Sequence, residues 1–223
     1  MLRRPSRLTK GCDSLLAPCR DEVDLEAPLP LPYMPEGVSW NGSIAFLDRD
    51  GVINIGSENY INNPDEVVLL PDSPKSIGTL RRLGYRVCVV TNQSPIGRGL
   101  WTSQNLANIH KRMQEMILEE DSDAHFDLIL HSPYAPWEGA WARKPFPGML
   151  EAGRQLIDKA SVDPNLSDLE LFYGDDWTDR PLDPSSFMVG DRQVDIMAAN
   201  RYGIKSYLCN PEVGLSGVME EII

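Results

Sequence analysis

Long apolar runs, closely paired cysteines and an excess of basic residues are all missing from this sequence of 223 residues. No stretch approaches the roughly 20 apolar residues that a membrane-spanning helix needs, so we expect no membrane association. The four cysteines show no CxxC spacing, and Cys88 lies inside an apolar run, which indicates buried thiols and not a disulfide framework. The sequence also has no internal repeats, which excludes a repeat architecture.

Positive charge is scarce where a nucleic-acid-binding protein would need it. The net charge is −12, and residues 1–42 carry five basic and six acidic side chains, so the remaining 181 residues carry −11. Nonspecific nucleic-acid binding depends on Lys and Arg replacing phosphate counterions, so we expect no nucleic-acid partner. An anionic substrate would need positive charge concentrated at its own site.

Residues 1–42 differ in composition from the rest of the chain. A basic head leads into an acidic patch at 21–26 and then a proline-rich segment at 27–32. Proline donates no backbone hydrogen bond, so we expect an extended arm that docks on the domain or stays mobile and is dispensable for chemistry. Because no long apolar segment follows the basic head, we expect no secretory signal and a cytoplasmic location.

From residue 43 to 223, short apolar runs alternate with helical patterns. The patterns predict strands at Ile44–Asp48, Tyr85–Thr91, Phe126–Ser132, Phe187–Gly190 and Ile204–Cys209, and helices near Pro74–Leu83, Ser103–Glu120, Pro147–Lys159 and Asp195–Tyr202. This alternation predicts one α/β domain with a mainly parallel sheet and helices on both faces.

The first predicted strand ends in Asp48-Arg49-Asp50-Gly51. Side chains two apart on a strand point the same way, so Asp48 and Asp50 should project together, with Gly51 free to turn the backbone. Two carboxylates this close are costly unless a cation or a proton lies between them. A strand that simply ends at a polar turn is the competing explanation.

Polar residues also follow the other strands, at the edge where ligands bind in open parallel sheets. Four groups follow the first four strands in turn: Asp48 and Asp50; Thr91, Asn92 and Gln93; Arg143 and Lys144; Asp191 and Asp195. Carboxylate oxygens suit Mg²⁺, and the hydroxyl, the helix-entry N–H groups and the two cations suit a phosphate. Each group alone could be a turn, a helix cap or a surface charge, but their shared position favours a single site.

These segments resemble the four motifs of the haloacid dehalogenase (HAD) superfamily. The motifs read Asp48-Arg49-Asp50-Gly51-Val52-Ile53-Asn54, Val90-Thr91-Asn92-Gln93-Ser94, Arg143-Lys144-Pro145-Phe146-Pro147-Gly148-Met149 and Met188-Val189-Gly190-Asp191. The chain is similar, over roughly residues 43–212, to the branch that holds D-glycero-D-manno-heptose 1,7-bisphosphate phosphatase and the histidinol-phosphatase domain. The resemblance implies a Rossmann-like HAD fold without a large cap domain.

The resemblance also implies catalytic roles. Asp48 would be the nucleophile that forms an aspartyl-phosphate, and Asp50 would be the general acid and base. Thr91 and the N–H of Asn92 would hold phosphate oxygens, and Lys144 would screen the charge between the phosphate and the nucleophile.

A metal ion and a substrate contact follow from the same resemblance. Mg²⁺ would be ligated by Asp48, by the backbone carbonyl of Asp50 and by Asp191, with Asp195 in support. Arg143 would meet the substrate.

One loop departs from the branch, whose members often carry a zinc loop reading Cys-Pro-His-His-Pro and then Cys-x-Cys before Arg-Lys. The matching residues 132–136 and 140–142 contain neither Cys nor His, so we expect no structural zinc. Tyr134, Trp137 and Trp141 should hold this loop by packing instead, and His131 should be a packed strand residue.

The acidic segment 165–183 is a second departure, because it is longer than the family connection. Its Asp175-Asp176 pair suggests a second metal site. Because the pair precedes the fourth strand, we expect instead a solvated loop at the sheet edge opposite the active site.

The sequence therefore favours a monomeric Mg²⁺-dependent phosphatase. The expected substrate is a small sugar phosphate such as D-glycero-D-manno-heptose 1,7-bisphosphate, which would lose its 7-phosphate. One alternative is hydrolysis of histidinol phosphate. Another is a catalytically idle phosphate-binding module that uses the arm as its contact.

Overall fold

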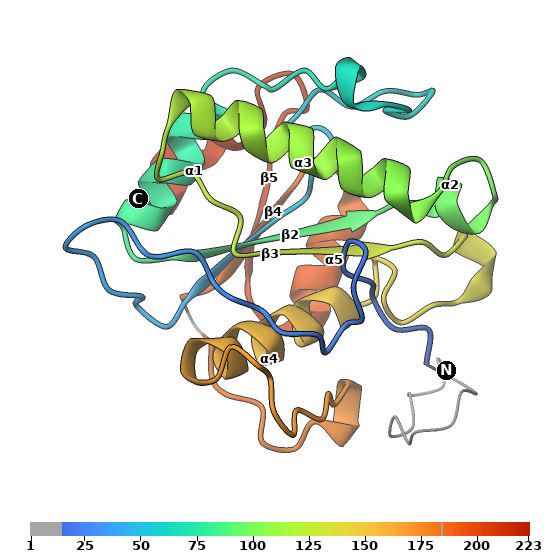
Figure 1. The fold of residues 1–223 in the computed structure, drawn as a ribbon, viewed down its shortest axis with the longest axis vertical. Helices are drawn as coiled ribbons and strands as arrows, with labels where there is room; N and C mark the ends of the chain where they lie inside the picture. Colours follow the sequence, from blue (N-terminus) through green and yellow to red (C-terminus); the bar gives the residue numbers. More distant parts are fainter. Residues whose placement is uncertain (1–14, 184) are drawn as a thin grey trace.

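A parallel five-stranded sheet forms the centre of the protein, in the strand order β3-β2-β1-β4-β5 (Figure 1). The computed structural model describes residues 15–183 and 185–223, so the first 14 residues of the predicted arm lie outside the described part. The strands are β1 (Ile44–Leu47), β2 (Arg86–Asn92), β3 (Leu128–Ser132), β4 (Phe187–Gly190) and β5 (Lys205–Leu208).

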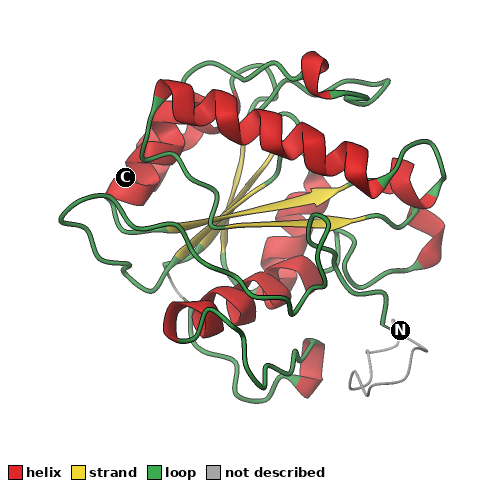
Figure 2. Ribbon diagram, viewed as in Figure 1, coloured by secondary structure: helices red, strands yellow, loops and turns green. Residues whose placement is uncertain are grey.

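Helices cover both faces of the sheet (Figure 2). The helices are α1 (Ser73–Arg82), α2 (Ser94–Gly97), α3 (Ser103–Glu120), α4 (Gly148–Val162), α5 (Gln193–Tyr202) and α6 (Met219–Ile222). Helices α1, α3 and α6 pack on one face, and α4 and α5 pack on the other. Short 3₁₀ turns lie at Pro64–Glu66, Pro136–Glu138, Gly174–Asp176 and Gly214–Val218.

Strand β1 is buried between the two layers of helices. Alternate side chains of a strand point to opposite faces, so Ile44 and Phe46 pack beneath α4 and α5 while Ala45 and Leu47 pack beneath α1 and α3. All four are fully buried, as expected for the central strand of a parallel sheet. The rigid strand fixes the position of the residues that follow it.

The predicted α/β fold is confirmed. All five predicted strands and all four predicted helices are present, with ends displaced by no more than three residues. Helices α2 and α6 were not predicted, because four residues are too few to display a helical period. Within the described residues, no helix is both long enough and apolar enough to cross a lipid bilayer.

Residues 15–42 lie along the outside of the domain and contain no helix or strand (Figure 1). Leu29 is buried in the core beneath α4, and its N–H donates to the carbonyl of Pro164 at 2.8 Å. Cys19 and His131 exchange two backbone hydrogen bonds of 2.9 Å, which pair the arm antiparallel to the outer edge of β3. These contacts anchor the described part of the arm on the domain.

Candidate active site

Lys144 lies at the centre of the charged groups that follow the strands. Its Nζ is 2.8 Å from Asp48 Oδ1 and 2.6 Å from Asp195 Oδ1, and it donates to the carbonyl of Val90 at 2.8 Å. Lys144 is only 2% exposed and Asp195 is fully buried. A cation enclosed in this way fixes the position of both carboxylates.

The turn after β1 brings the first and fourth motifs into direct contact. Gly51 has a φ of +76°, a conformation that glycine adopts without strain. A Cβ atom at this position would lie 2.6 Å from Asp191 Oδ2, so a larger residue would displace the Asp191 side chain. The sequence interpretation of Gly51 as a turn residue therefore understated its importance.

Three carboxylates form a cluster that fits a divalent cation. One oxygen each from Asp48, Asp191 and Asp195 lies within 4.8 Å of the others. Asp191 Oδ1 is buried and accepts no hydrogen bond from the described residues, an arrangement that is costly without a cation. An all-oxygen ligand set of this kind suits Mg²⁺.

The local electrostatics follow from burial and from crowding of like charges. Burial raises the pKa of Asp48 to about 7, with Lys144 opposing the rise and the Asp195 charge adding to it. The pKa of Asp191 is also raised, by burial and by Asp195. Burial alone would lower the pKa of Lys144, but the two adjacent carboxylates hold it above its ordinary value. These directions favour a bound cation or proton among the carboxylates.

Asp50 is held by three neighbours. Arg49 Nη2 donates to both carboxylate oxygens at 2.9 and 2.7 Å, and Arg49 Nε donates to Oδ1 at 3.1 Å. Asn54 Nδ2 and Gln93 Nε2 donate to it at 3.0 and 3.3 Å. Burial raises the pKa of Asp50, but the charge and hydrogen bonds of Arg49 outweigh it, so the pKa lies below its usual range.

The end of β2 supplies the hydroxyl group of Thr91 and the side-chain amide of Asn92. Gln93 Nε2 donates to Thr91 Oγ1 at 2.8 Å, so the hydroxyl proton of Thr91 can be donated to a ligand. Asn92 Nδ2 donates to the carbonyl of Lys144 at 3.0 Å, and Asn92 Oδ1 accepts from its N–H at 3.1 Å. The Asn92 side chain therefore ties β2 to the loop that carries Lys144.

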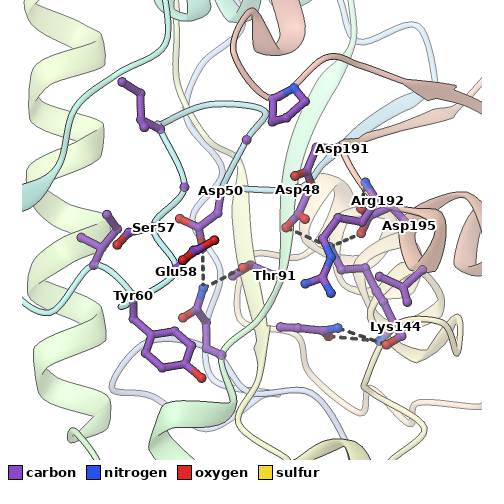
Figure 3. A pocket seen from close by; sticks show the side chains of 18 of the residues that line it. Asp48, Asp50, Ser57, Glu58, Tyr60, Thr91, Lys144, Asp191, Arg192 and Asp195 are labelled. Atoms are coloured by element: carbon purple, nitrogen blue, oxygen red, sulfur yellow. Dashed lines mark hydrogen bonds and ion pairs between the residues drawn. The ribbon is translucent and has the colours of Figure 1, made fainter.

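A cavity of about 640 Å³ opens onto these groups (Figure 3). It brings together Asp48, Asp50, Thr91, Asn92, Lys144, Asp191 and Asp195. The lining residues that were not singled out from the sequence include Arg192, Glu58 and Tyr60. Arg192 could have been found from the sequence, because it is a basic residue directly after the predicted site residue Asp191. The irregular loop that contains Glu58 and Tyr60 shows no comparable pattern.

Arg143 does not line the main cavity. It lines a neighbouring cavity of about 240 Å³, which it shares with Lys144 and Arg192. Its Nη1 donates to the carbonyl of Tyr134 at 2.9 Å, so the loop between β3 and α4 holds it in place. Two arginines therefore line this second cavity together with Lys144.

In the loop that departs from the family's zinc loop, Trp141 packs as predicted and Tyr134 is half-buried. Trp141 stacks on Phe146 with ring centroids 5.2 Å apart, and its Nε1 donates to Glu151 of α4 at 2.7 Å. Trp137 is 76% exposed, so the expectation that it packs was wrong. His131 is buried within β3, as expected.

The acidic segment does not stay at the far edge of the sheet, contrary to expectation. After α4 the chain turns back along that helix, where Phe172 and Gln155 exchange hydrogen bonds of 2.8 and 2.9 Å. The N–H of Gly174 then reaches Glu151 in the first turn of α4 at 3.0 Å. Asp175 and Asp176 thus lie at the end of α4 nearer the site, although neither lines the main cavity. The topological rule failed because the connection is long enough to double back.

Comparison with known proteins agrees with the fold. A sequence model of the family described as polynucleotide kinase 3 phosphatase matches residues 43–209, more than half of the chain. A D-glycero-beta-D-manno-heptose-1,7-bisphosphate 7-phosphatase from Haemophilus ducreyi is 30% identical over 167 residues, which cover 72% of this chain and 79% of the relative. The Pseudomonas aeruginosa protein of the same name is 40% identical over 121 residues, 54% of this chain. This chain spans 65% of the length of that relative, less than two thirds.

A solved structure shares the architecture. The crystal structure of D,D-heptose 1,7-bisphosphate phosphatase from B. bronchiseptica, complexed with magnesium and phosphate, aligns with a TM-score of 0.61 and 28% identity. The alignment covers 81% of this chain and 97% of that one. The fold and the site thus define the class of HAD-like phosphatases, and within it the chain belongs to the family of the D,D-heptose 1,7-bisphosphate phosphatases. The family resemblance of the four motifs is confirmed.

Proposed function

We propose that this protein hydrolyses a small phosphomonoester with the help of Mg²⁺, and that its substrate is a sugar phosphate such as heptose 1,7-bisphosphate. The observation that carries the proposal is the Lys144 cation held 2.8 Å from Asp48, beside a cluster of three carboxylates. This arrangement offers a nucleophile, a charge screen and a metal site at one edge of the sheet.

The chemistry would proceed in two steps. Asp48 attacks phosphorus and takes over the phosphoryl group, and Asp50 protonates the leaving alkoxide. Asp50 then accepts a proton from the water that hydrolyses the aspartyl-phosphate. Thr91 and the backbone N–H of Asn92 hold phosphate oxygens, and Lys144 stabilises charge on the phosphoryl group in both steps.

Asp50 needs to change its protonation state during this cycle. Its ion pair with Arg49 favours the carboxylate, which is the form required for the second step. An arriving phosphate dianion raises the pKa of a neighbouring carboxyl group and so supplies a reason for proton uptake before the first step.

The metal would be held by Asp48, Asp191 and the backbone carbonyl of Asp50, with Asp195 in support. Mg²⁺ bound there supplies positive charge to the phosphoryl oxygens and allows the nucleophile and the phosphate to approach each other. Asp195 in turn accepts the N–H of Arg192 at 3.0 Å, which fixes the start of α5 beside the cluster.

A bisphosphate suits the second cavity. Arg143 and Arg192 line it together, within the same region as Lys144, so a second anionic group would meet fixed positive charge there. Arg143→Gln should therefore raise the KM for a bisphosphate more than the KM for the matching monophosphate. Equal changes in the two KM values would contradict this placement of the second phosphate.

The activity is tested by release of inorganic phosphate from a panel of substrates with Mg²⁺ or with EDTA. The panel contains heptose 1,7-bisphosphate, mannose 6-phosphate, histidinol phosphate and an oligonucleotide with a 3′-phosphate. We expect Mg²⁺-dependent cleavage of the sugar phosphates, and no cleavage by Asp48→Asn. Asp179→Asn, at an exposed carboxylate of the acidic segment, is the matched control and should keep full activity.

Preference for histidinol phosphate or for the oligonucleotide would overturn the substrate assignment. No Mg²⁺-dependent release from any of the four compounds would support the idle phosphate-binding module instead.

A further inference from the structure

The described arm reaches a buried histidine next to the active site. Asp21 Oδ2 lies 2.8 Å from His110 Nδ1, and His110 on α3 is 1% exposed. The other ring nitrogen, Nε2, lies 3.4 Å from Nη1 of Arg49. Arg49 in turn holds the carboxylate of Asp50, so a continuous set of contacts links the arm to the predicted general acid and base.

The partners of His110 determine which nitrogen carries its proton. An ionised carboxylate only accepts hydrogen bonds, and a guanidinium only donates them. Burial raises the pKa of Asp21, but His110 and the positive charge of Arg49 lower it more, so Asp21 is held as a carboxylate. The consistent arrangement places the proton on Nδ1, facing Asp21, and leaves the lone pair of Nε2 facing Arg49.

Arg49 depends on that lone pair. Its side chain is 2% exposed, and its Nε and Nη2 groups donate to Asp50. His110 Nε2 is the acceptor that faces Nη1. If the proton moved to Nε2, two donors would face each other in the interior, and the guanidinium would have to shift. Asp50 would shift with it.

Contacts with β3 and within the arm hold Asp21 in place. It comes two residues after Cys19, whose backbone is paired with His131 of β3. Arg20 beside it donates to the carbonyls of Leu25 and Pro28 at 3.4 and 3.2 Å, which fixes the turn of the arm. The Asp21 side chain is 21% exposed and also lies 3.4 Å from His131 Nδ1.

We propose that the arm completes the active site, with Asp21 acting as a positioning residue that sets the tautomer of His110 and thereby the placement of Arg49 and Asp50. This proposal rests on the proposed function, because it assigns the arm to the acid and base of that reaction. It replaces the expectation that the arm is dispensable for chemistry.

The leaving group distinguishes this role from a merely structural one. An alkoxide leaves poorly and needs a proton from the general acid, whereas 4-nitrophenolate leaves readily without one. Because kcat/KM reports the first phosphoryl transfer, misplacing Asp50 should lower kcat/KM for the sugar phosphate but not for 4-nitrophenyl phosphate. A general loss of folded protein would lower both equally.

The test compares Asp21→Leu, which keeps the size of the side chain, with wild type. We expect kcat/KM for the best sugar phosphate of the panel to fall about 10-fold and kcat/KM for 4-nitrophenyl phosphate to stay within about twofold. Asp24→Leu, at an exposed carboxylate of the same arm, is the matched control and should change neither value. Equal losses for the two substrates, or no loss, would overturn the proposal.

A second variant tests whether Asp21 acts through His110. A glutamine at position 110 can present its amide oxygen to Arg49 whatever the state of residue 21. In the His110→Gln background, Asp21→Leu should therefore have no further effect on the ratio of the two kcat/KM values. A ratio that still falls about 10-fold would show that Asp21 acts through another group, such as His131.

The tautomer is also measurable without any activity. The chain has three histidines, so ¹⁵N spectra of histidine-labelled protein can be assigned with His110→Gln. We expect a protonated Nδ1 and an unprotonated Nε2 at His110 in wild type, and loss of this pattern in Asp21→Leu. The same pattern in both proteins would refute the proposal even if no substrate were cleaved, whereas inactivity of wild type alone would count only against the proposed function.

Discussion

Replacing Lys144 with methionine removes the cation on which the site's charge balance depends. At an effective dielectric constant of ~20, contacts of 2.8 Å to Asp48 and 2.6 Å to Asp195 each correspond to about 6 kcal/mol of attraction. Burial of the charges offsets much of this, and removing one partner of a buried ion pair costs about 3–5 kcal/mol on balance. We expect a loss of that size in the free energy of unfolding at pH 7 without added metal.

Lys75→Met is the matched control for this measurement. Lys75 also makes an ion pair of 2.8 Å, with Asp72, but its side chain is 72% exposed and screened by water, so its loss should change the free energy of unfolding far less than the loss of Lys144. Unfolding in urea, followed by tryptophan fluorescence, measures both variants. The destabilisation of Lys144→Met relative to Lys75→Met should be smaller at pH 5, because the carboxylates left without a cation take up protons.

Equal urea midpoints for the two lysine variants at pH 7 would refute the account of a buried charge centre.

Lys144→Met also tests catalysis, because Lys144 contacts the nucleophile. Loss of this cation should lower phosphate release by about 10²–10³-fold, whereas Lys75→Met should leave it unchanged.

Two further predictions concern the stability of the folded protein. Without metal, stability should fall as the pH rises from about 4 to about 7, because burial raises the pKa of Asp48 from 3.8 to about 7 and the folded state then binds a proton that the unfolded state has released. Mg²⁺ should restore the loss at pH 7, and a thermal-unfolding series that is flat with pH would contradict this. Asp127→Asn should cost about 3–5 kcal/mol in urea unfolding, because Asp127 is fully buried between the guanidinium groups of Arg81 and Arg86. Asp123→Asn, a partly exposed control, should cost under about 1 kcal/mol, and equal costs would contradict the prediction.

The sequence predicted several of the residues that the structure brings together in one cavity. Asp48, Thr91, Lys144 and Asp191 are far apart in the chain, but the carboxyl ends of parallel strands meet at one edge. Hydrophobic patterns located the strands, and the polar residues after them, with Lys144 past a loop, identified part of the cavity lining. The catalytic roles of these residues remain part of the proposed function.

The contacts of the arm could not be predicted in the same way. Residues 15–42 have no hydrophobic period, and Asp21 is one of four acidic residues within positions 21–26. Its contact with His110 spans 89 positions and depends on how the arm crosses the edge of β3. Long-range packing of an irregular segment leaves no local signal. The course of the acidic segment 165–183 was missed for the same reason.

The pairing of Cys19 with β3 also affects how molecules associate with one another. An outer strand presents unpaired N–H and C=O groups that can recruit a strand from a second molecule. The arm occupies part of this edge, and its prolines at 28, 30 and 32 cannot donate hydrogen bonds to an incoming strand. A chain that began at residue 43 would retain every residue of the charged cluster, yet we expect it to aggregate more readily than the full chain.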